Sequence, residues 1–126
     1  MRAVDTNVLV RVLSRDDPKQ AAAADQFISA GAWVSHLVLM EAMWVLSTAA
    51  GLDPSNLARA IQMVLDHKDL TLEDSDTVTA ALAEFRRHPA LGFADCLILE
   101  VARHAGHLPL GTFDRPLARL QGVHKL

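Results

Sequence analysis

The chain has 126 residues and a mass of 13.7 kDa, the size of a single domain that can bury one core. Hydrophobic residues make up 51% of it, which excludes a disordered chain. The formal charge of −3, from 12 basic and 15 acidic residues, argues against a simple basic nucleic-acid clamp. A single cysteine excludes an internal disulfide and fits a reducing, cytoplasmic setting.

Short strand-like segments alternate with longer helix-like segments. In the first half of the chain we predict a strand at Arg2–Val4, helices over 6–14 and from Pro18 to about 30, a strand at Trp33–Ser35, and helices over 37–50 and Pro54–His67. In the second half we predict a strand at Leu70–Leu72, helices over Asp76–Arg87 and Phe93–Gly106, and strands at Leu108–Gly111 and Val123–Lys125. Such alternation indicates βαβ units. We therefore predict an α/β fold, a three-layer α/β/α sandwich around a central, mostly parallel sheet of four or five strands, in one domain over residues 1–126.

The sequence predicts neither a membrane span nor a signal peptide. The longest apolar stretch, residues 37–52, is shorter than the ~20 residues that cross a bilayer, and it contains Glu41. Asp5 interrupts the apolar start of the chain, and no small-residue cleavage site follows it. We therefore expect a soluble, cytoplasmic protein.

Four acidic residues have unusual surroundings. Glu41, in HLVLMEAMWVLS, and Asp95, in LGFADCLIL, lack a basic residue at helical-neighbour spacing. Placing an ionised carboxylate among apolar side chains costs free energy unless a nearby group compensates its charge. Asp5 ends the first predicted strand and Asp114, in GTFDRPL, follows the fourth; capping of a helix N-terminus explains these two equally well. Ligands of parallel sheets bind beyond the carboxyl ends of the strands, where these two acids lie.

Other residues have ordinary structural explanations. Glu100 can reach an arginine and a histidine on its own helix and is expected on a solvated face, as is Asp25 among small neighbours. Cys96 has no histidine placed near it and is expected to be a small core residue. Trp33 and Trp44 lie in apolar runs, and we expect both in the core.

A divalent cation would resolve the problem of the four acids. Clustered carboxylates without a cation repel one another, and their pKa values rise. A carboxylate set without histidine or cysteine favours Mg²⁺ or Mn²⁺ over zinc. Such an ion can activate water and neutralise a phosphodiester undergoing hydrolysis.

The segments VDTNVLVRVL, HLVLMEAMWVL, FADCLIL and TFDRPLARLQGV resemble, in order and spacing, a PIN-domain ribonuclease, and most closely the VapC-like toxins of type II toxin–antitoxin pairs. The resemblance implies an endoribonuclease that uses one or two Mg²⁺ ions, with Mn²⁺ as a substitute. It implies that the catalytic, metal-binding residues are Asp5, Glu41, Asp95 and Asp114. Asn7 and Thr112 would support these ligands by hydrogen bonds. It also implies an RNA substrate, a cognate antitoxin and a homodimer.

An acidic protein can still hold RNA. Setting the four acids aside leaves 11 acidic residues against 12 basic ones, so local positive charge can attract phosphates. Candidates for this role, each also explained as an ordinary surface residue, are Arg11, Arg15, Lys19, residues 86–88 and Arg115.

Three alternatives remain. A receiver-type phospho-acceptor signalling module has similar size and alternation, but Asp16 and Asp17 follow a helix, and Lys125 is next to last. A phosphatase or dehalogenase could use Asp5 as nucleophile, but the phosphatase needs a second aspartate where Asn7 stands. A catalytically idle interaction partner would keep the fold, but the intact set of four acids argues against it.

Overall fold

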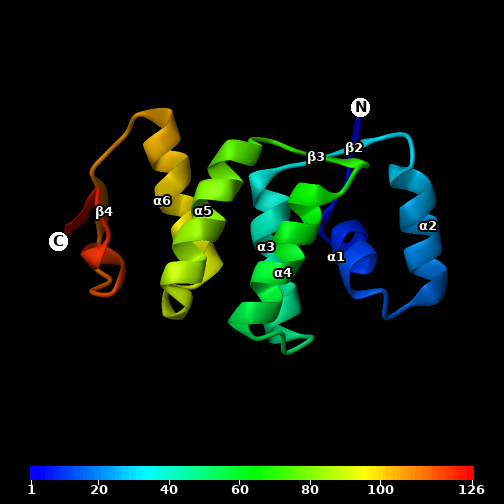
Figure 1. Cartoon of the computed structure of the whole chain (residues 1–126), viewed down its shortest axis with the longest axis horizontal. Coiled ribbons are helices and arrows are strands. Elements are labelled where there is room, and N and C mark those ends of the chain that lie inside the picture. Colours follow the sequence, from blue (N-terminus) through cyan, green and yellow to red (C-terminus); the bar gives the residue numbers. More distant parts are fainter. The chain divides into compact units, whose positions relative to one another are not determined.

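The computed structural model describes residues 1–126, in two units, Met1–Ser75 and Asp76–Leu126. The elements of the first unit are β1 (Arg2–Ala3), α1 (Thr6–Ser14), α2 (Pro18–Ile28), β2 (Ala32–Val34), α3 (His36–Thr48), α4 (Pro54–Asp66) and β3 (Leu70–Leu72) (Figure 1). They are followed by α5 (Ser75–Arg87), the 3-10 turn η1 (Pro89–Leu91), α6 (Phe93–Ala105), β4 (Leu110–Thr112), the 3-10 turn η2 (Leu117–Arg119) and β5 (Val123–Lys125).

Side-chain caps define the helix starts of the first unit. An aspartate or serine precedes each of its four helices and accepts a hydrogen bond from a backbone N–H in the first turn; these caps are Asp5, Asp17, Ser35 and Asp53. Pro18 and Pro54 occupy first helical positions, where a missing N–H costs nothing. Local chemistry therefore explains why the predicted helix starts agree closely with the observed ones.

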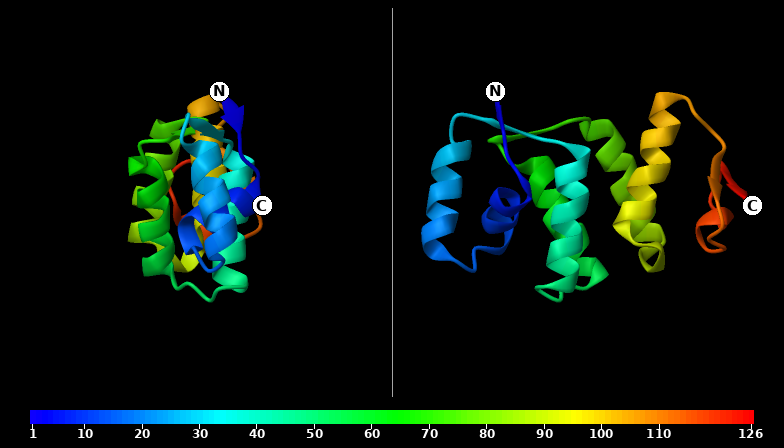
Figure 2. Two further views of the ribbon diagram at one scale, coloured as in Figure 1. Left: turned by 90° about the vertical axis from the view of Figure 1, so that its right-hand side faces the viewer. Right: turned by 180° about the vertical axis from the view of Figure 1, so that it is seen from behind.

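Three parallel strands form the sheet of the first unit, in the order β1–β2–β3. Ala3 aligns with Trp33, and Trp33 aligns in turn with Thr71. Helix α1 packs against both α2 and α3, and α4 packs against α3 and β3 (Figures 1 and 2). The prediction that Trp33 and Trp44 lie in the core is wrong: Trp33, on the opposite face of β2 from buried Ala32 and Val34, is 36% exposed, and Trp44 is 66% exposed.

In the second unit, β4 and β5 pair in parallel, and a small core holds them to α6. That core contains Leu99, Leu117 and Leu120, with Leu91, Leu110 and Val123 packed against it. Phe85 of α5 meets Phe93 of α6 edge to face, with ring centroids 6.0 Å apart. Cys96 is fully buried, which confirms its prediction as a core residue.

Glu100 corrects a prediction in the second unit. We expected it on a solvated helix face, but it is only 5% exposed. Its carboxylate lies 3.3 Å from Arg103, whose guanidinium also donates to the carbonyl of Gln121 at 2.9 Å. The arginine therefore holds the chain before β5 against α6 and compensates the charge of the buried acid.

The predicted α/β class with parallel strands is confirmed. All five predicted strands occur, within two residues of their expected bounds, as a sheet of three in one unit and a sheet of two in the other. A single central sheet, and one domain over the whole chain, stay predictions. No helix combines the length and the apolar composition that crossing a bilayer requires.

Candidate active site

Asp5 lies where β1 gives way to α1. The backbone N–H of Val4 still donates to the carbonyl of Trp33, so the strand pairing continues up to the aspartate. Asp5 Oδ1 then accepts the N–H of Val8 at 3.1 Å and caps the helix. The other oxygen of this exposed carboxylate makes no hydrogen bond within the protein. Capping and ligation are therefore compatible, one on each oxygen.

Glu41 reaches the same place from α3. Its Oε1 accepts the hydroxyl of Thr6, the residue after Asp5, at 2.6 Å. Because the helical neighbours of Glu41 are apolar, we expected its side chain to be buried. The residue is exposed instead, because two of these neighbours, Leu37 and Trp44, are themselves 74% and 66% exposed. The packing of α1 on α3 thus brings Glu41 to Thr6, the residue after Asp5, in the first unit.

Asp95 and Asp114 form the corresponding pair in the second unit. Asp95 stands in the first turn of α6, where its pKa is raised above the usual value by burial and, to a smaller degree, by the negative charge of Asp114. Asp114 Oδ2 accepts the N–H of Leu117 at 3.0 Å, and its own N–H donates to the hydroxyl of Thr112 at 3.0 Å. Two neighbouring carboxylates at this place favour a cation.

Each unit therefore contributes two of the four predicted acids. Within either unit, no three histidine, cysteine, aspartate or glutamate side chains are grouped so that they could hold a metal ion. The convergence of all four acids on one site stays a prediction. Cys96, next to Asp95, is no nucleophile, because burial raises the pKa of its thiol to about 11.

Three of the predicted phosphate-attracting arginines, Arg11, Arg15 and Arg87, have acidic partners, and Arg87 lies 3.1 Å from Glu84. Arg11 lies 3.2 Å from Asp16, and Arg15 lies 2.6 Å from Asp25. The expected solvated face around Asp25 is confirmed, because its side chain is 45% exposed, but Asp25 has a basic partner that its own helix does not supply: Arg15, ten residues earlier in the chain. Lys19 is exposed and makes no ion pair.

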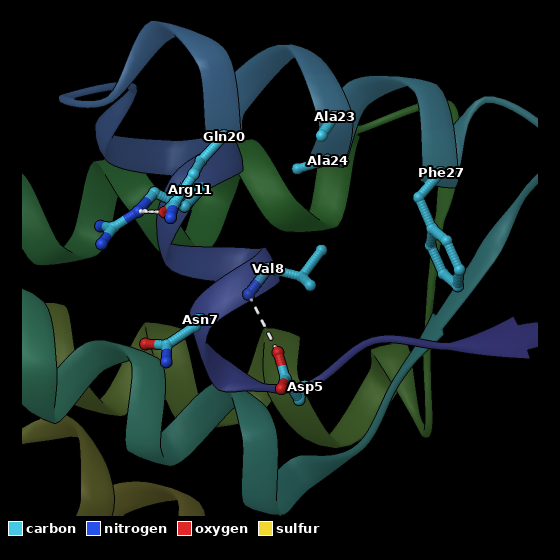
Figure 3. Close-up of a pocket in the computed structure, with 8 residues that line it drawn as sticks. All are labelled: Asp5, Asn7, Val8, Arg11, Gln20, Ala23, Ala24 and Phe27. Carbon is cyan, nitrogen blue, oxygen red and sulfur yellow. Dashed lines mark hydrogen bonds between the residues drawn. The ribbon is translucent and has the colours of Figure 1, made fainter.

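A cavity of about 400 Å³ opens between α1 and α2, with Asp5 in its wall (Figure 3). Its lining includes Asn7 and Arg11 from α1, and Gln20, Ala23 and Phe27 from α2. Sequence reasoning missed the α2 contribution, because glutamine, alanine and phenylalanine spaced along an amphipathic helix give no signal of a ligand.

The family model of the PIN domain matches residues 2–123. The chain belongs to the PIN domain family. A search of curated proteins and a search of solved structures each found no match. PIN domains are typically nucleases, so the membership indicates a nuclease-type hydrolase, and it gives no support to a receiver-type module.

Proposed function

We propose that this protein is a metal-dependent endoribonuclease that uses Mg²⁺, or Mn²⁺ in its place, to hydrolyse phosphodiester bonds of RNA. The observation that carries the proposal is how the acids lie within each unit: Glu41 is hydrogen-bonded to Thr6, the residue after Asp5, and Asp114 is near enough to Asp95 to help raise its pKa. The proposal requires the strands to belong to one central sheet of a three-layer α/β/α sandwich. The carboxyl ends of its strands would then bring both pairs to one edge.

The donor set fits a hard divalent cation. Asp5 and Glu41 each keep one oxygen free of protein hydrogen bonds. Burial and the nearby charge of Asp114 both destabilise the ionised form of Asp95, and a cation beside it would stabilise that form. All four candidate ligands supply oxygen, which suits Mg²⁺ and Mn²⁺. When bound, such an ion activates water and neutralises charge on the phosphate.

The chain's own residues orient this site. Thr6 holds Oε1 of Glu41 and thereby fixes the direction of the other oxygen. The N–H of Val8 does the same for Asp5, and the N–H of Leu117 does so for Asp114. The side-chain amide of Asn7, exposed beside Asp5, can donate to a phosphate oxygen or to a ligand carboxylate.

We further propose that the enzyme is the toxin of a toxin–antitoxin pair, acts as a homodimer and is held inactive by a cognate antitoxin. The support is the order and spacing of the four acid-bearing segments. An antitoxin that covers Glu41 would also find apolar surface, because Leu37 and Trp44 are exposed on the same helix. Induced wild-type protein should arrest growth, and Asp5→Asn should not.

The nuclease is tested with purified protein and an unstructured RNA. Cleavage should require Mg²⁺ or Mn²⁺, stop with EDTA, and be lost in Asp5→Asn and in Asp95→Asn. Asp53→Asn is the matched control, because Asp53 also caps a helix by accepting a first-turn N–H but lies outside the candidate site. Cleavage that survives EDTA, or persists in both candidate-site variants, would refute the proposal.

A further inference from the structure

The cavity between α1 and α2 has a polar end and an apolar end (Figure 3). Asn7, Arg11 and Gln20 lie toward one end, and Phe27 lies at the other. Its volume of about 400 Å³ falls in the range of roughly 300–1,000 Å³ that is usual for small-ligand sites. The cavity therefore has the size and the mixed character of a binding site for one small polar, partly apolar group.

The free hydrogen-bonding groups of the polar end can be assigned. Gln20 Oε1 accepts Nε of Arg11 at 2.5 Å, so the NH₂ group of Gln20 is left as a donor. The side-chain amide of Asn7 makes no hydrogen bond within the protein and offers both a donor and an acceptor. A ligand at this end would meet these amides beside the guanidinium of Arg11, whose remaining N–H groups are further donors.

The charges of the cavity do not favour an anion. The guanidinium of Arg11 is already shared between Gln20 and Asp16, the latter at 3.2 Å. Asp5 adds a negative charge to the wall. A phosphate would meet a carboxylate and a cation that is already paired, whereas a neutral ring with hydrogen-bonding edges would meet no such penalty.

The apolar end suits a flat ring. Ala23 and Ala24 leave room on the α2 side, and Val8 and Phe27 supply apolar surface. The guanidinium of Arg2 lies 3.9 Å from the centroid of the Phe27 ring and holds that ring from outside the cavity lining. Single-stranded RNA is commonly recognised through splayed bases that meet aromatic side chains and hydrogen-bonding groups.

We propose that this cavity binds one unpaired nucleobase of the RNA, adjacent to the phosphodiester that is cleaved. Gln20 and Asn7 read the edge of the base, and the Ala23–Phe27 side accommodates its ring. The inference rests on the proposed function, because Asp5 belongs both to the cavity wall and to the candidate metal site. The cavity thereby sets the sequence preference of cleavage.

Two neighbouring alanines of α2 provide the test. Ala23 lines the cavity and Ala22 does not, and both are exposed, so leucine at either position leaves the helix and the core intact. Wild type, Ala23→Leu and Ala22→Leu would cleave a pool of random-sequence RNA, with the cut sites sequenced. Loss of the base contacts in Ala23→Leu should reduce the preference at one position beside the cut by about tenfold. Ala22→Leu should keep the wild-type preference.

Binding supplies a readout that does not need cleavage. In an Asp95→Asn background, an RNA oligonucleotide with the preferred base should bind about tenfold more tightly than one with an abasic residue there. That difference should vanish with Ala23→Leu and with Gln20→Ala. Cleavage by all variants with unchanged base preference would overturn the cavity assignment alone. No metal-dependent cleavage by the wild type would overturn the proposed function and this inference with it.

Discussion

The Thr6 hydroxyl donates to Oε1 of Glu41 at 2.6 Å, which joins the first residue of α1 to the middle of α3. Thr6 follows Asp5 directly, so this one hydrogen bond relates two carboxylates that are 36 residues apart in the chain. Neither carboxylate has a cation as its partner in the first unit. The threonine is therefore the group that sets the direction of Glu41.

Thr6→Val should impair cleavage without unfolding the protein. Valine keeps the branched shape but cannot donate, so Glu41 loses its orientation, and catalytic efficiency should fall about 10- to 100-fold with a higher Mg²⁺ requirement. Thr6→Ser keeps the hydroxyl and should stay near wild type. Mg²⁺ titrations of the cleavage rate measure both. Equal behaviour of the valine and serine variants would show that the hydrogen bond has no role.

Substitutions of Asp5 should separate its two roles. Asparagine caps helices about as well as aspartate does, whereas alanine does not, so Asp5→Ala should lose about 1 kcal/mol of unfolding free energy that Asp5→Asn keeps. Both variants should lose cleavage, because both lose the carboxylate. Urea denaturation and the RNA assay together measure the two effects. Retained activity in the stable asparagine variant would leave Asp5 with a capping role only.

The Arg15–Asp25 ion pair predicts a pH-dependent stability. The hydrogen bond from Arg15 lowers the pKa of Asp25, so its contribution is present above the unfolded-state pKa of about 3.9 and is lost as pH falls through the lower folded-state value. Asp25→Asn should therefore melt at a lower temperature than wild type at pH 7. The difference should close in acid and shrink in high salt. A gap that does not change between pH 7 and pH 2 would contradict this assignment.

Cys96 should be inert in the folded protein. It is fully buried, and its thiol pKa of about 11 leaves almost no thiolate at neutral pH. A disulfide reagent at pH 8 should label the thiol only after denaturation. Cys96→Ala should cleave RNA at close to the wild-type rate. Rapid labelling of the native protein would contradict the observed burial.

The helix starts were predictable because their signals are local. Pro18 and Pro54 each follow a capping aspartate, and Gly106 ends α6 in a left-handed conformation that glycine adopts without strain. The four acids could be selected as candidates because they differ from their neighbours in residue type, and Asp5 and Asp114 also follow strand ends; their metal chemistry stays a prediction.

What sequence reasoning missed depends on packing between elements. Helix α3 is apolar on nearly every side, so its pattern could not tell that Trp44 faces outward. Glu100 has basic neighbours on its own helix, a pattern that is typical of a solvent-exposed face. The residue is nevertheless buried, where its partner Arg103 contacts the chain before β5. The bond between Thr6 and Glu41 exists only because α1 lies against α3.

The cap at Asp5 makes a candidate metal ligand part of the folding of α1. In an extended chain the side chain at this position rotates freely, and no first-turn N–H holds it. Its free oxygen acquires a fixed direction only when the helix has formed. In a partly synthesised or misfolded chain this candidate ligand would therefore not be aligned, and the proposed activity would require the native helix.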